Sequence, residues 1–110
     1  MIGRGGIPPK HVYSILLKNK AQVEAKVFVE YVMPDGSTEK SEMAAAPGQT
    51  VKIPQRTQQS GQVTNTGRIA RVSVSAGGRK AELREPFNVT SPTKDFPITF
   101  TNDGTLQQGL

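Results

Sequence analysis

The feature that most limits the fold of this chain is an alternation of side-chain character over residues 22–33. Apolar positions recur there at every second residue: Val23, Ala25, Val27, Val29, Tyr31 and Met33. A period of two places such positions on one face of a β-strand, and the β-branched content agrees. The intervening positions are polar apart from Phe28 and Val32. We therefore predict a strand with one buried face and a second face that is covered in part.

Residues 33–36, Met-Pro-Asp-Gly, predict a tight turn after this strand. Proline presets φ at the second turn position, and glycine can adopt the positive φ of a bulge. A three-residue hairpin loop gives a definite register. It pairs Met33 with Ser37, Glu30 with Lys40, and Val27 with Met43. Residues 38–46 then form the second strand of a hairpin, although their Glu, Lys, Met and Ala content leaves a helix as the alternative.

A second hairpin is predicted within residues 63–87. Apolar and polar residues alternate on both sides of Gly77-Gly78, which permits the positive φ values of a two-residue turn. The expected pairs are Val74 with Ala81, Val72 with Leu83, Ser73 with Glu82, and Arg71 with Arg84. Apolar pairs then share one face and polar pairs the other, so the turn and the register agree.

These hairpins and the shorter alternating segments predict an all-β fold, an antiparallel β-sandwich of about seven strands. The immunoglobulin-like type is the expected architecture at this size. The further strands are expected in residues 11–18, 50–53 and 96–100, and an exposed loop in residues 55–61. The predicted organisation is a flexible N-terminal arm (1–10), one β-sandwich domain (11–102) and a polar C-terminal tail (103–110).

The composition narrows the class of protein further. Cysteine is absent, which excludes disulfides and thiol chemistry and suits a reducing compartment. No apolar run approaches the ~20 residues of a membrane span, and no signal-peptide pattern begins the sequence. We expect a soluble cytoplasmic protein that does not contact a membrane.

The sequence offers little for catalysis. His11, the single histidine, stands beside the N-terminal arm, and no phosphate-binding loop motif occurs. We interpret the carboxylates in and beside the first hairpin as part of a solvated, charge-balanced face, not as a catalytic pair. These are Glu24, Glu30, Glu39 and Glu42. We therefore expect a protein that is not an enzyme and needs no cofactor or metal.

The second hairpin carries the candidate binding residues. Residues 48–84 hold seven bases and a single acid, within a chain of formal net charge +5. Like charges directly opposite each other, as expected for Arg71 and Arg84, destabilise a sheet unless something offsets them. Glu82, a bound anion or an acidic partner could do so. The candidates are Arg68, Arg71, Arg79, Lys80 and Arg84.

Three functions follow as hypotheses. The first is a non-catalytic protein-interaction domain that binds another protein, an acidic one included, through a sheet edge or loops. The alternative is anion or nucleic-acid binding through the basic hairpin 68–84, although stacking aromatics are absent from that hairpin. The third is a ligand or inhibitor module displayed on loops 34–37, 55–61 and 77–79.

Overall fold

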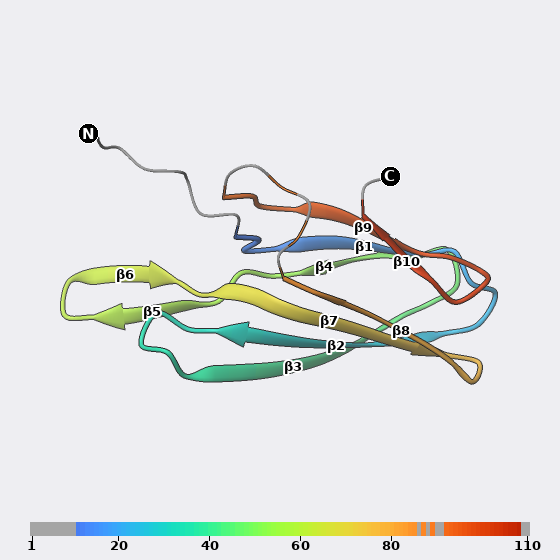
Figure 1. The fold of residues 1–110 in the computed structure, drawn as a ribbon, viewed down its shortest axis with the longest axis horizontal. Coiled ribbons are helices and arrows are strands. Elements are labelled where there is room, and N and C mark those ends of the chain that lie inside the picture. Colours follow the sequence, from blue (N-terminus) through green and yellow to red (C-terminus); the bar gives the residue numbers. More distant parts are fainter. Residues whose placement is uncertain (1–10, 86, 88, 90–91, 109–110) are drawn as a thin grey trace.

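The computed structural model describes residues 11–85, 87, 89 and 92–108, and within them the chain is entirely β (Figure 1). The described residues contain ten strands and no helix, so none of their elements could cross a membrane as a helix. The strands are β1 (Ile15–Asn19), β2 (Ala25–Val32), β3 (Thr38–Ala45), β4 (Thr50–Ile53), β5 (Thr57–Ser60), β6 (Val63–Thr66), β7 (Arg68–Ala76), β8 (Arg79–Arg84), β9 (Phe96–Phe100) and β10 (Leu106–Gln108). The all-β prediction is confirmed.

Two four-stranded sheets lie face to face (Figure 1). One has the order β10-β9-β1-β4, and the other has the order β3-β2-β7-β8. Strands β5 and β6 form a separate two-stranded ribbon that extends from one end of the molecule. The connections β1–β2, β3–β4 and β8–β9 each pass from one sheet to the other, so both sheets must assemble around one interior.

The interior between the two sheets is apolar because inward positions recur at every second residue of the paired strands. In β2, for example, Ala25, Val27, Val29 and Tyr31 are buried, and they belong to the same core as Ile98 and Phe100 of β9 in the other sheet. The largest fully buried side chains are Tyr31, Phe100, Ile15, Leu17, Met33, Ile53, Ile69 and Ile98. Burial of this apolar surface is the main term that stabilises the fold.

The first hairpin has the predicted register. The Met33 N–H donates to the Ser37 carbonyl at 2.7 Å, and Glu30 lies opposite Lys40. Gly36 has φ +88°, which an L-residue rarely adopts, and its N–H donates to the Met33 carbonyl at 2.8 Å. Residues 38–45 are a strand, so the helical alternative is wrong: pairing along the whole of β2 outweighs their helix propensity.

The second hairpin is likewise confirmed. All four predicted pairs occur, Arg71 opposite Arg84 among them, and Gly77 and Gly78 have φ of +56° and +80°. The partner of β7 on its other side is β2, and the register between these two strands shifts after Glu30. Ala70 is the extra residue at that bulge, which lets Ile69 and Val72 both face the interior while Arg71 faces solvent.

Several expectations differ from the structure. Residues 55–61 are not a loop, because Thr57–Ser60 is a strand that pairs with Val63–Thr66. Backbone hydrogen bonds and the turn at Gly61 (φ +62°) are enough to order this strand, although it has no apolar side chain. The predicted tail contributes β10, which pairs with β9. Strand β1 runs parallel to β9, so the architecture is not purely antiparallel. The predicted N-terminal arm (1–10) lies outside the described residues.

Tyr31 links the two layers through a polar contact inside the core. Its hydroxyl donates to the Pro54 carbonyl at 2.6 Å, the Arg56 guanidinium lies 5.3 Å from its ring centroid, and burial raises its pKa.

We expect Tyr31→Phe to lower the free energy of unfolding by about 1 kcal/mol, since the Pro54 carbonyl loses its donor. Chemical denaturation measures this loss. Tyr13→Phe is the control, and equal losses for the two variants would contradict the assigned hydrogen bond.

Candidate functional site

The candidate site is the solvent face of the sheet β3-β2-β7-β8, which we call the outer face. Its side chains come from the polar positions of each strand and form rows that run across the sheet, because neighbouring strands are paired residue by residue. Each row has one residue from each strand in the order β3, β2, β7, β8. The first row is Ala44, Lys26, Ser75 and Lys80; the second is Glu42, Phe28, Ser73 and Glu82; the third is Lys40, Glu30, Arg71 and Arg84.

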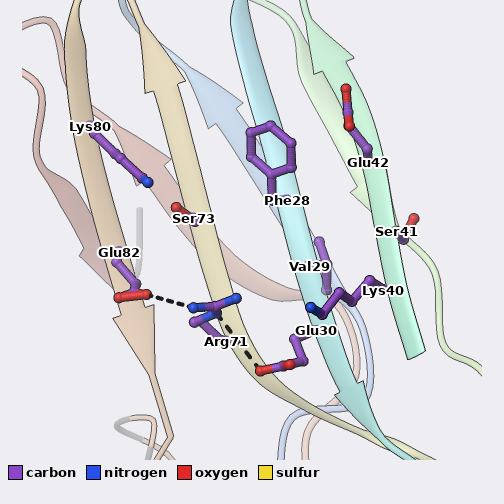
Figure 2. A pocket seen from close by; sticks show the side chains of 10 residues that line it. All are labelled: Phe28, Val29, Glu30, Lys40, Ser41, Glu42, Arg71, Ser73, Lys80 and Glu82. Atoms are coloured by element: carbon purple, nitrogen blue, oxygen red, sulfur yellow. Dashed lines mark hydrogen bonds and ion pairs between the residues drawn. The ribbon is translucent and has the colours of Figure 1, made fainter. Parts of the chain in front are cut away.

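Phe28 is the apolar centre of this face (Figure 2). It belongs to the middle row of a central strand, yet 39% of its surface is exposed. Its neighbour on β7 is Ser73, which is too small to cover the ring and forms the floor beside it. A groove of about 520 Å³ results, with Phe28 on one side and Lys80 and Glu82 on the other.

An ion-pair cluster closes one end of the groove. The Arg71 guanidinium lies between two carboxylates, 3.4 Å from Glu82 and 3.8 Å from Glu30 (Figure 2). Glu82 also accepts a hydrogen bond from Arg84 Nε at 3.2 Å, and the two arginines hold the pKa of Glu82 below its usual value. The repulsion expected between Arg71 and Arg84 is therefore offset within the protein by Glu82.

The five predicted binding residues do not form one basic patch. Arg71, Lys80 and Arg84 belong to the outer-face rows, and Arg68 forms an ion pair with Glu85 at 3.0 Å. Arg79 lies at an inward position of β8, and its guanidinium donates to the Asp103 carbonyl at 2.6 Å. The Arg79 contact ties the β7–β8 hairpin to the turn before β10, so this residue has a structural partner outside the outer face.

Sequence reasoning missed three residues of the outer face. The alternation predicts partial cover for Phe28, and the 39% of its surface that stays exposed at the centre of the face is what the pattern does not single out. Lys26 and Lys40 were not singled out, although they are exposed and stand in the rows on either side of Phe28. The signal in the sequence is Phe28 itself, an aromatic residue between the charged Lys26 and Glu30 on the same face of the strand.

A second groove of about 680 Å³ lies between the β2–β3 turn and the β5–β6 ribbon. Pro34, Thr64 and Arg68 contribute to it, and His11, the first described residue, stands on its border next to Tyr13. All residues that line the groove beside Phe28 lie within the strands of one sheet, so we take that groove as the candidate site.

The outer face offers charged, polar and aromatic groups for contact with another molecule. The side chains that it presents are carboxylates, ammonium and guanidinium groups, serine hydroxyls and one phenyl ring. Within residues 11–85, 87, 89 and 92–108 no group of three or more acidic or histidine side chains is gathered as a metal site would require. Comparison of the chain with models of protein families, with curated proteins and with solved structures finds no match.

Proposed function

We propose that this protein is a non-catalytic interaction domain that binds another protein through its outer face and the adjoining edge strand β3. The observation that carries the proposal is Phe28, an exposed aromatic side chain at the centre of a sheet face that is otherwise mostly polar and charged. An apolar anchor surrounded by a polar rim is the usual arrangement of a protein-binding surface.

The energetics of Phe28 support a role in contact. Covering the exposed part of a phenylalanine stabilises a complex by on the order of 1–2 kcal/mol, which reaches the lower limit for a binding hot spot. The ring contributes less to the fold than an inward residue would, because it lies on the solvent side of the sheet. The partly exposed Phe28 ring can therefore stabilise a complex with a partner more than it stabilises the fold.

Strand β3 adds a second kind of contact at the border of this face. It is the last strand of its sheet, so the outward backbone groups of alternate residues have no strand to pair with in the described chain. Because Met33 and Ser37 exchange a hydrogen bond, the outward groups are those of Thr38, Lys40, Glu42 and Ala44. One strand of a partner could pair there while another segment of the same partner packs on Phe28.

The basic-hairpin alternative has less support. Arg68, Arg71 and Arg84 each form an ion pair with a glutamate of the same chain, and Arg79 has a backbone partner. An incoming phosphate would have to compete with those carboxylates. We therefore favour a protein partner over a nucleic acid.

Two further assignments belong to the same proposal. The two packed sheets and the connections that cross between them support an immunoglobulin-like β-sandwich, with the parallel β1–β9 pair as a departure from the antiparallel pattern. The lack of cysteine supports a place in the reducing cytoplasm.

Retention of partners by the immobilised protein tests the proposal. Phe28→Ser should weaken retention of a specific protein from its own cell lysate by about tenfold at moderate salt, because the apolar anchor is lost. The matched control is Val63→Ser, which removes an apolar side chain that is 58% exposed on the β5–β6 ribbon. Retention of no protein, or equal retention by the wild type and Phe28→Ser, would count against the outer face as an interaction surface.

A further inference from the structure

We propose that the outer face recognises an extended acidic segment with a large apolar residue, in which Asp or Glu stands two positions before and two positions after that residue. This inference rests on the proposed function, because it names the chemistry of the partner for the same surface. Some charges of the outer face are already paired within the chain, and the spacing of the unpaired ones defines the partner's chemistry.

The basic and acidic groups of the outer face are not equally available. Glu30 and Glu82 are bound by Arg71, and Glu82 also by Arg84. By contrast, no ion pair within the described residues involves Lys26, Lys40, Lys80 or Glu42. The unpaired groups are therefore three cations and one anion, so the surface around Phe28 presents excess positive charge to a partner.

The rows place these cations at a spacing that an extended chain can match. Lys26 and Lys80 belong to the row on one side of Phe28, and Lys40 belongs to the row on the other side. The two basic rows are four residues apart along β2, or about 13 Å at the usual rise of a strand. In an extended segment that runs along β2, side chains at positions i, i+2 and i+4 share one face and span the same distance.

The match assigns a residue type to each position of the segment. Position i+2 would pack on the Phe28 ring above Ser73, in a row that holds carboxylates at Glu42 and Glu82 and therefore disfavours an acid. Positions i and i+4 would place carboxylates within reach of the lysine rows on either side. The side chains at i+1 and i+3 point away from the sheet and carry no requirement.

A nucleic acid fits the same surface less well. A phosphate backbone carries charge at every nucleotide, so it would have to cross the acidic row of Glu42 and Glu82 between the two lysine rows. Among the described residues that line the groove, Phe28 is the single aromatic one, whereas binding of a single strand uses aromatic side chains on which successive bases stack. Discrete carboxylates separated by an apolar residue avoid both difficulties.

Selection from a random peptide display library on the full chain tests the inference. Peptides enriched by the wild type and lost with Phe28→Ser should show the acid–x–apolar–x–acid pattern. The charge-swap variant with Lys26→Glu and Lys80→Glu should bind those peptides about tenfold more weakly and enrich peptides with a basic residue at one of the two acidic positions. The control carries Lys20→Glu and Lys94→Glu, which change the net charge equally at exposed positions outside the rows, and it should enrich the original pattern.

Each other outcome overturns the inference in a distinguishable way. Peptides that depend on Phe28 but have no acidic bias would refute the acidic segment and leave the proposed function standing. Enrichment that Phe28→Ser does not change would refute both. A fluorescent oligothymidine strand is the third probe: if the charge-swap variant loses its binding while Phe28→Ser retains it, the cations serve a nucleic acid instead of a peptide.

Discussion

Replacing Phe100 by alanine should lower the free energy of unfolding by about 3–5 kcal/mol, the usual range for removing a buried phenylalanine. The Phe100 side chain is fully buried at the end of β9, where it faces the interior together with Ile98. Its truncation removes apolar contacts and leaves a cavity that the surrounding strands can fill only in part. A loss of this size is a large fraction of the stability of a typical domain.

Thermal or chemical denaturation followed by circular dichroism measures this effect, and the expected fall in Tm is on the order of 20 °C. Phe28→Ala is the matched control, because it makes the same substitution on the same type of element at a position with 39% exposure. We expect it to cost at most about 1–2 kcal/mol. Equal losses at the two positions would contradict the assignment of Phe100 to the interior and of Phe28 to the outer face.

Asn19→Ala should produce the second-largest loss, about 3 kcal/mol, although no apolar contact is at stake. The Asn19 side chain is fully buried, and its amide donates to the carbonyls of Val23 and Ala45 at 2.9 and 3.0 Å. Its own carbonyl oxygen accepts from the Ala21 N–H at 2.9 Å. One side chain thus holds the connection between β1 and β2 against the end of β3. Alanine would remove these three hydrogen bonds from backbone groups to which water has poor access.

Equilibrium unfolding in urea gives the value, with Asn65→Ala on the exposed strand β6 as the control. Asn19→Asp separates hydrogen bonding from shape, because it keeps the side-chain volume but replaces the amide donor by an ionised carboxylate. At neutral pH it should cost at least as much as Asn19→Ala, since that carboxylate would face the carbonyls of Val23 and Ala45. A harmless Asn19→Asp would mean that the amide does not hold these carbonyls.

The two hairpins were predictable because turn chemistry and alternation each specify the same register. Gly36 and the Gly77-Gly78 pair occupy the positive-φ positions that their turns require, and both registers follow from them. Local information of this kind sets which residues face inward. For that reason Val27 and Val72 could be placed in the core from the sequence alone.

Other parts of the fold depend on contacts that local patterns do not carry. Strands β5 and β6 are built almost entirely from Thr, Gln, Asn and Ser, so alternation gives no signal there. The parallel pairing of β1 with β9 joins segments about eighty residues apart, and no turn specifies it. Strand β10 is a three-residue strand of mostly polar side chains that is ordered by its neighbour β9.

The candidate site was only partly predictable for the same reason. The sequence identified Arg71 and Arg84 as a repulsive pair, and the register confirms that they are opposite. It also named Glu82 as a residue that could offset this repulsion, but it did not identify the Glu30–Arg71 pair, because that pair depends on β2 lying beside β7. Because Arg71 and Arg84 are paired with glutamates of the same chain, the unpaired lysines around Phe28 are the distinctive feature of the face.

Site-specific photo-crosslinking in cells tests the central claim most directly. A benzophenone amino acid placed at Phe28 keeps an aromatic ring at the centre of the outer face, and the same group placed at Val63 samples the β5–β6 ribbon. We expect a discrete protein adduct from position 28 that is lost when Lys26 and Lys80 are changed to glutamate, and no such adduct from position 63. An adduct from position 63 alone, or no protein adduct from position 28, would contradict the outer face as the binding surface.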